Sequence, residues 1–422
     1  MEVETIIPYE LYSDAPGILF NKAEWDAAHA AHPHDFDFGS VPKGWRTELK
    51  GPQVWTGEYL SQNPHLYIRE ITSVEIAEVD AAIQLWKELA LPLLKLNRER
   101  FSLPNFGRVL QELAHNIYHG VGVQVLRGFP IQSYSKEDQI IAFLGINSWV
   151  GDERLNQGAD RGLCHIKSIT HIDPSKRGKI YVSAQDTNAQ MYHSDAGGDI
   201  VSLMAVSLSG TGGASTLASS WQVYNHLAKH RPDILRILGQ RKFRWQANGI
   251  PDEGVNLIHQ DNGKLFLNFS TRTFIGYGEI PDRDTRYPSL TFEEREAFGG
   301  WQWVADQHRL ETELQPGDIE WVNNLHLQHA RRGFTEDISR PRHLLRVWLR
   351  NSELSPRNLP LDIRRKFDAM FSQPPTFYPV DEMDEDERRR ATGIFTGSCK
   401  TEDAGERLVK GGIGANNTTS IR

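Results

Sequence analysis

The chain has 422 residues, of which 39% are hydrophobic and 24% are charged, and its formal net charge is -8. This composition is typical of a globular protein that is large enough to bury a substantial core. The negative charge is spread along the chain without a block of Lys or Arg, which argues against a nucleic-acid partner. No apolar run approaches the length of a membrane span, so we expect no membrane partner either.

The two cysteines, Cys164 and Cys399, are far apart and belong to no CxxC pattern. Neither a disulfide framework nor a cysteine-based zinc cluster is therefore indicated. The N-terminal residues are acidic where a signal peptide would carry positive charge. We expect a cytoplasmic protein, and the sequence leaves open whether it forms a homo-oligomer.

The first half of the chain predicts an extension followed by helices and a strand. Residues 1–64 are rich in Pro, Gly, Trp and acidic residues with weak periodicity, which predicts an irregular wrapping extension. Thr72 and Glu75 form a capping-box pattern in front of an apolar stripe at helical spacing, which predicts a helix over 73–90. Alternating valines predict a strand within 120–129, and Ser135 opens a second capped helix that runs to about residue 145.

From residue 199 onward, strand patterns dominate. An Asn-Gly pair is the favoured two-residue turn of a β-hairpin, and a proline inside a helical pattern interrupts the helix. The elements expected are a buried strand over 199–208, a turn over 211–215, a short strand over 215–219, a helix broken at Pro232 over 221–238, a hairpin turning at Asn262-Gly263 and a helix that begins at Thr291 and passes Val304.

The last predicted strand, over 342–350, alternates between two faces. One face is aliphatic apart from a histidine, and the other carries three arginines and Trp348. Because unpaired buried charge is unfavourable, the arginine face must either meet water or line a pocket that binds anions. Beyond this strand the chain turns polar, and we expect a C-terminal extension over 353–422 that ends in a disordered tail.

The segment QMYHSDAGG places His193 and Asp195 at the head of an apolar run. In an extended segment these two side chains point to the same side, which gives two metal ligands on one face. The same spacing occurs at His171 and at His259, but the first motif runs into a proline and the other lies at the predicted hairpin. By itself the motif favours an ordinary hydrogen-bonded pair at a strand end over a metal site.

A metal site here needs a third ligand, and the segment 313–334 offers His326 and His329. Two histidines and one carboxylate leave three positions free on an octahedral Fe(II), the facial triad of non-haem oxygenases. Zinc prefers a closed or tetrahedral set. The residues alone leave both histidines open as the third ligand.

In these residues the chain resembles the TauD/TfdA family of Fe(II)/2-oxoglutarate dioxygenases. The resemblance covers about residues 52–351, in the family's order. The matching segments are WTGEYL, GVQVLRGF, MYHSDAGG, GTGGASTLASSWQVYNHL, LQPGDIEWVNNLHLQHARRGF and RPRHLLRVWLRN. The family's His-Gly-Arg is replaced here by His329-Ala330-Arg331.

The resemblance implies an α+β fold with a mainly β core, a double-stranded β-helix (jelly roll) with flanking helices, in a domain over 65–352. It implies Fe(II), 2-oxoglutarate and O2 as cofactor and cosubstrates. The implied site residues are His193, Asp195 and His329 as iron ligands, Thr216 as the hydrogen-bond partner of the distal carboxylate of 2-oxoglutarate, Arg342 as its salt-bridge partner, and Arg346 facing 2-oxoglutarate or an anionic substrate group.

The function expected from this resemblance is oxidation of a small molecule that bears a carboxylate, such as an amino acid or a secondary-metabolite intermediate, with release of succinate and CO2. Hydroxylation, desaturation and cyclisation remain open as outcomes. Two alternatives are a 2-oxoglutarate oxygenase that acts on a macromolecule and a catalytically silent jelly-roll module that binds an anion through its arginines.

Overall fold

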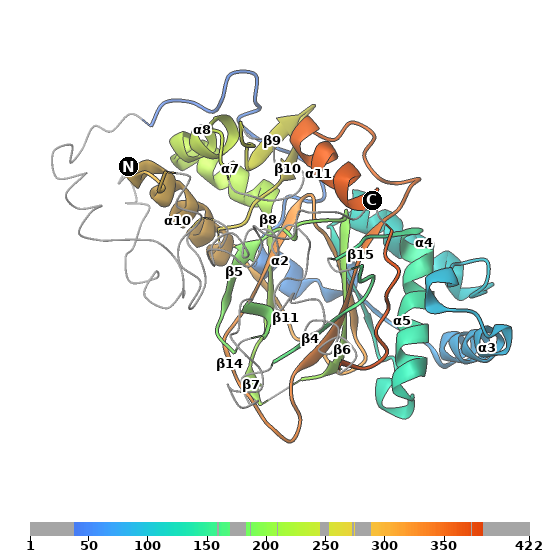
Figure 1. Ribbon diagram of the computed structural model, residues 1–422. Coiled ribbons are helices and arrows are strands. Elements are labelled where there is room, and N and C mark those ends of the chain that lie inside the picture. Colours follow the sequence, from blue (N-terminus) through green and yellow to red (C-terminus); the bar gives the residue numbers. More distant parts are fainter. Residues whose placement is uncertain are drawn as a thin grey trace, which may run out of the picture.

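The computed structural model describes residues 38–382, apart from 158–159, 169–182, 186, 209, 245–252, 272–273, 275–287 and 373. Within this part the chain is a mixed α/β fold with two strand-rich sheets at the centre and helices outside them (Figure 1). The start of the predicted N-terminal extension and the predicted disordered tail lie outside the described residues. No helix in the described part is long and apolar enough to cross a membrane.

The larger sheet has seven strands, and its order places β6 and β15 side by side at the centre. The order is β1 (Ile68–Glu70), β2 (Val123–Arg127), β12 (Ile319–Asn323), β6 (Ile200–Ser207), β15 (His343–Arg350) and β3 (Glu153–Arg154), with β4 (Cys164–Lys167) also paired to β15. The predicted strands over 120–129, 199–208 and 342–350 are therefore all members of one sheet.

The smaller sheet has four strands in the order β11 (Leu310–Thr312), β8 (Ser215–Ser219), β13 (Leu327–Arg331) and β5 (Gln190–His193). Two further pairs are the hairpin of β9 (Ile258–Asp261) with β10 (Lys264–Leu267), and β7 (Thr211–Gly212) with β14 (Phe334–Thr335). The segment expected as a turn over 211–215 therefore begins with a two-residue strand.

Two groups of helices cover the outer faces of the sheets (Figure 1). The outer face of the larger sheet packs against α3 (Ser73–Leu89), α4 (Phe106–His119) and α5 (Lys136–Val150), and that of the smaller sheet packs against α7 (Ser220–His230), α8 (Pro232–Gln240) and α10 (Phe292–Gln307). Shorter helices are α2 (Gly57–Gln62), next to β11, and α11 (Leu361–Phe371), which packs on the β9–β10 hairpin.

Local sequence signals explain where several elements begin. The capping boxes predicted at Thr72 and Thr291 are both present, and the side chain of Ser135 caps α5. The hairpin turns at Asn262 and Gly263, which both have positive φ, as a tight two-residue turn requires. The helix α4 was not among the predicted elements, although its buried residues recur at helical spacing.

The strand register shows which side chains lie between the sheets. In the smaller sheet His193, Leu217 and His329 are directly opposite one another and share a face, and Leu217 packs with inner residues of the larger sheet. In the larger sheet Glu320, Leu203 and Arg346 are aligned in the same way. Because side chains alternate along a strand, these residues line the space enclosed by the two sheets.

The segments on either side of the predicted 65–352 domain pack on the same core. Trp55 is 3% exposed and its indole donates a hydrogen bond to the carbonyl of Val121. Ile363 and Phe367 of α11 are buried against Phe266 of the hairpin. The boundaries 1–64, 65–352 and 353–422 stay predictions.

Candidate metal centre

Three predicted ligands come together between the sheets. His193 ends β5, Asp195 follows two residues later, and His329 lies directly opposite His193 on β13. The Oδ1 atom of Asp195 is 3.4 Å from Nε2 of His193 and 3.5 Å from Nε2 of His329. The two imidazole centroids are 4.3 Å apart. Two ring nitrogens and one carboxylate oxygen therefore point at a common position.

A backbone carbonyl orients the ring of His193. Nδ1 of His193 lies 2.8 Å from the carbonyl oxygen of Met191, which can only accept, so Nδ1 carries the proton and Nε2 presents its lone pair. Burial and the nearby His193 lower the pKa of His329, which favours the neutral form of its ring. A second ring nitrogen bonded to a carbonyl is the usual arrangement of a metal-binding histidine.

The other carboxylate oxygen of Asp195 is held by the larger sheet. Its Oδ2 accepts hydrogen bonds from Nη1 of Arg346 at 2.9 Å and from Nε1 of Trp348 at 2.6 Å. Burial opposes ionisation of Asp195, but Arg346 and the two histidines hold its pKa well below the usual range. Asp195 is therefore a carboxylate with one oxygen fixed and the other directed at the histidines.

Two amides that the sequence analysis missed hold this arrangement in place. Gln157 accepts from Nε of Arg346 at 2.9 Å and donates to the carbonyl of the same residue at 3.0 Å. Asn324 accepts from the backbone N–H of Asp195 and donates to the carbonyls of Asp195, Gly197 and Gly198. The pair Asn323-Asn324, just before the histidine-rich segment, was a visible signal for the second amide, whereas nothing local marks Gln157.

Farther along the enclosed space lies a pair of buried arginines. Arg331 and Arg342 are 4% and 6% exposed, and burial together with the charge of Arg331 lowers the pKa of Arg342 to about 9. Among the described residues, Glu320 is an acid that offsets this charge, and burial raises its pKa to about 7. Within the described residues, Nε of Arg342 has no hydrogen-bond partner. The two buried guanidinium groups therefore favour the binding of an anion beside them.

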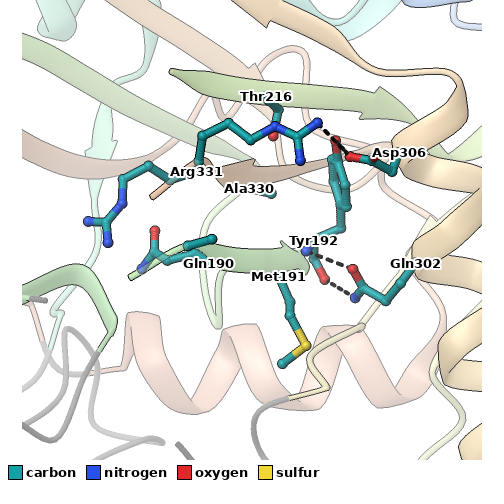
Figure 2. Close-up of a pocket in the computed structure, with 10 residues that line it drawn as sticks. Gln190, Met191, Tyr192, Thr216, Gln302, Asp306, Ala330 and Arg331 are labelled. Carbon is teal, nitrogen blue, oxygen red and sulfur yellow. Dashed lines mark hydrogen bonds and ion pairs between the residues drawn. The ribbon is translucent and has the colours of Figure 1, made fainter. Parts of the chain in front are cut away.

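The structure does not bring Thr216 to this space. Thr216 is paired with Ala330 in the sheet, so it points to the opposite side from His329 and hydrogen-bonds the hydroxyl of Tyr192. There it lines a pocket of about 30 Å³ behind β5 and β13, which Figure 2 shows with Gln302 and Asp306. That volume suits one water molecule and is too small for a substrate.

The neighbouring residue lies on the other face. Ser215 is directly opposite Arg331 and shares its side of the sheet, the side that also carries His329. It is buried, with 7% of its surface exposed. The buried residue that faces the arginine pair from β8 is therefore Ser215, one position before the predicted threonine.

The other candidate histidines lie elsewhere. His326 is buried against Trp221 and Phe266, its Nδ1 is 2.6 Å from the carbonyl of Leu265, and burial lowers its pKa to about 4. His259 lies on β9, where its ring contacts the carbonyl of Asn256. The motif at His171 falls outside the described residues.

The three arginines of the 342–350 segment differ in their surroundings. Arg342 and Arg346 are buried and β15 is an inner strand, so the reading of an arginine face that meets water is wrong for these two. Arg350 forms an ion pair with Glu153 and is covered by Phe371. It is therefore not available for a substrate anion in the way that the sequence suggested.

The residues present fit the expected cofactors. A donor set of two imidazoles and one carboxylate, all on one side of the metal position, suits Fe(II) with open positions. The unpartnered Nε of the buried Arg342 suits a carboxylate, which a guanidinium binds through two parallel hydrogen bonds. Both requirements are met by side chains that line the same enclosed space.

Comparisons with known proteins agree with this geometry. Residues 89–348 match the family model described as taurine catabolism dioxygenase TauD, TfdA family. The taurine hydroxylase-like protein SAT17 of Stachybotrys chartarum is 31% identical over 77% of this chain and 85% of its own length. The FR-33289 synthase of Streptomyces rubellomurinus is 24% identical over 65% of this chain and 82% of its own length.

A solved structure shares the fold. The crystal structure of an asparagine oxygenase is similar with a TM-score of 0.50 and 15% identity, over 70% of this chain and 97% of that one. The family match spans most of the described residues, and the curated relative exceeds 30% identity over most of both chains. The chain therefore belongs to the TauD, TfdA family and is a non-haem dioxygenase that uses Fe(II), 2-oxoglutarate and O2.

Proposed function

We propose that the enzyme oxidises a small, carboxylate-bearing metabolite or amino acid, with release of succinate and CO2, and that His193, Asp195 and His329 hold its Fe(II). One observation carries the assignment of the ligands. A ring nitrogen of each histidine and one oxygen of a fixed carboxylate converge between the sheets, while His326 and His259 contact backbone carbonyls elsewhere.

For the distal carboxylate of 2-oxoglutarate we propose Arg342 and Ser215. Arg342 supplies a buried guanidinium whose Nε lacks a partner within the described residues. Ser215 supplies a hydroxyl on the same inner face, whereas Thr216 points away from it. Arg346 is proposed to orient Asp195, since its contacts go to that carboxylate and to Gln157.

The two sheets are proposed to form a double-stranded β-helix, or jelly roll. Two features support this reading. The inner faces carry the candidate ligands from β5 and β13 and the groups of β15 that contact Asp195. The outer faces are both covered by helices. Such a core keeps the site on rigid strands rather than on loops.

The chain's own residues position and protect the reaction. Bound Fe(II) with 2-oxoglutarate and O2 supplies the oxidising power. His193, Asp195 and His329 leave one side of the metal position open for the cosubstrates. Arg342 and Ser215 hold the far end of 2-oxoglutarate, so that its chelating end meets the metal in one orientation. Leu203, Leu217 and Trp348 line the space with apolar surface and exclude water.

Charge supports an anionic or zwitterionic substrate. Arg331 and Arg342 contribute two positive charges to a buried place in which Glu320 is the nearby acid. One distal carboxylate of 2-oxoglutarate neutralises one of these charges. Because burial raises the pKa of Glu320 to about 7, its protonated form leaves one positive charge that favours a second anion in the enclosed space. The curated relative named as a taurine hydroxylase-like protein supports hydroxylation of a small molecule as the first outcome to test.

The experiment is a screen for succinate release. The purified full chain is given Fe(II), ascorbate, O2 and 2-oxoglutarate together with amino acids, small carboxylates and sulfonates. We expect slow release without a substrate and faster, substrate-dependent release with members of the panel, and none with H329A. A folded, iron-loaded wild type that releases no succinate with or without the panel would contradict the proposal and favour the silent anion-binding module.

A further inference from the structure

We propose a second metal site, formed by His165, His343 and Glu382, that binds Zn²⁺ where the C-terminal segment crosses β4 and β15. The site lies outside the enclosed space, since His343 and Arg342 are adjacent and point to opposite sides of the chain. It is built from three separate parts of the sequence. It goes beyond the dioxygenase activity, because none of its residues belongs to the first centre.

The two histidines already face each other. Nδ1 of His165 is 2.8 Å from Nε2 of His343, and one ligand atom from each of His165, His343 and Glu382 lies within 4.8 Å of the other two. His165 is 5% exposed and Glu382 is 19% exposed in its side chain. Two nitrogens and one oxygen thus converge in a sheltered place, as they do in the first centre.

The protonation of His165 suits a ligand. Its Nε2 lies 3.0 Å from the carbonyl oxygen of Pro379, which can only accept a hydrogen bond. The proton of the ring therefore sits on Nε2, and Nδ1 accepts the hydrogen bond from Nε2–H of His343. Zn²⁺ binding to both nitrogens would move that proton of His343 to its Nδ1 or to solvent. A metal-binding histidine commonly donates its other N–H to a carbonyl in this way. His193 shows the same arrangement with Met191 in the first centre.

Glu382 brings a negative charge from the C-terminal segment. Its carboxylate accepts hydrogen bonds from Nζ of Lys167 at 2.7 Å and from Nζ of Lys136 at 3.3 Å. Burial opposes ionisation, but the hydrogen bond from Lys167 lowers the pKa of Glu382 below its usual range. A carboxylate has about four lone-pair directions, so two lysine contacts leave room for a metal bond.

The donor set is compatible with Zn²⁺, and the same ligand types are proposed to hold Fe(II) in the first centre. Two histidines and one carboxylate with a fourth position open is a usual zinc set, and zinc favours tetrahedral geometry. With bonds of about 2.0–2.1 Å, ligand atoms of such a site are about 3.3 Å apart. The rings need to separate by about half an ångström from their present hydrogen-bonded contact. A bound ion would tie Glu382 to the strand that carries Arg342 and Arg346 on its inner side.

The test uses the full chain with the first centre removed. H193A/H329A is stripped of metal with a chelator and titrated with Zn²⁺ in a calorimeter. We expect one Zn²⁺ per chain. Adding H165A or E382Q should weaken binding more than tenfold. E336Q is the matched control, because Glu336 accepts a hydrogen bond from Ser168 beside β4 and lies outside the three ligands.

Two results would overturn the proposal. One is a dissociation constant weaker than about 100 µM in the H193A/H329A background. The other is binding that H165A and E382Q leave unchanged. In either case the cluster is a hydrogen-bonded contact only. Co²⁺ provides a second readout, because a tetrahedral site gives an intense visible spectrum, and far-UV circular dichroism shows whether each variant is folded.

Discussion

Trp348 donates its indole Nε1–H to Oδ2 of Asp195 over 2.6 Å, so a residue of the larger sheet fixes a candidate ligand that follows a strand of the smaller one. Arg346 adds a charged hydrogen bond to the same oxygen. This leaves Oδ1 directed at the two histidines, and Oδ1 is the oxygen of Asp195 proposed to bind the metal. The arrangement makes the tryptophan a positioning residue whose removal should be visible in metal affinity.

The variant W348F should bind Fe(II) or Co(II) about 10- to 100-fold more weakly, because it loses one of the two hydrogen bonds that orient Asp195. Calorimetry on the metal-free protein measures this directly. W321F is the matched control, since Trp321 is equally buried in the same sheet but donates to Asn147. Equal metal affinity of W348F and the wild type would show that the indole does not position Asp195.

Asn324 should matter for both the fold and the metal. In N324D the donors to three carbonyls are lost and a carboxylate faces them instead. We expect the free energy of unfolding to fall by about 2–4 kcal/mol and metal affinity to fall more than tenfold. Denaturant unfolding and calorimetry provide the two numbers.

N323D provides the comparison, because Asn323 donates to the carbonyl of Ile117, away from Asp195. It should lose stability but keep the metal affinity of the wild type. If N323D and N324D lowered the metal affinity equally, the contact of Asn324 with Asp195 would have no specific role in metal binding.

Substitutions of Ser215 and of Thr216 should differ in their effect on 2-oxoglutarate binding. S215A should raise the dissociation constant of 2-oxoglutarate about tenfold, since it removes a hydrogen bond to a charged carboxylate. T216V should leave that constant within twofold, because its side chain faces Tyr192. Titration of the anaerobic Fe(II) protein with 2-oxoglutarate measures both. If T216V weakened 2-oxoglutarate binding more than S215A, Thr216 would be the hydrogen-bond partner of the distal carboxylate, as the sequence suggested.

Glu320 should make stability depend on pH. Burial raises its pKa to about 7 in the folded protein, above the unfolded value of 4.5. The folded state therefore binds the extra proton, and wild-type stability falls as the pH rises from about 4.5 to about 7. E320Q does not titrate, so its stability relative to the wild type should rise across this interval by up to about 3 kcal/mol. Urea unfolding at pH 5 and pH 8 measures the change, and a difference between the two proteins that is independent of pH would contradict it.

Much of the fold could be predicted from local signals. Capping boxes at Thr72 and Thr291 and the Asn-Gly pair at residue 262 are short-range chemistry, and the structure confirms the elements that they start. The alternation in 342–350 correctly separated two faces of β15. What alternation could not show is that both faces are buried, because that depends on the second sheet and on helices from distant parts of the chain.

Part of the candidate site could also be predicted from local sequence, and part could not. The spacing of His193 and Asp195 follows from the period of a strand, and the structure brings His329 opposite them. Thr216 and Ser215 differ by one residue, and a one-residue step in a strand reverses the face, so only the observed register separates them. Gln157 reaches Arg346 across 189 positions of sequence, a contact that no local pattern marks.

We propose that His193, Asp195 and His329 hold Fe(II) beside an Arg342-bound 2-oxoglutarate. The most direct measurement is the visible charge-transfer band of the anaerobic protein with Fe(II) and 2-oxoglutarate. We predict the band in the wild type and no band in H193A or H329A. In R342M the band should form only at a much higher concentration of 2-oxoglutarate. A folded, metal-loaded wild type without the band, or a band that survives in H329A, would contradict the account.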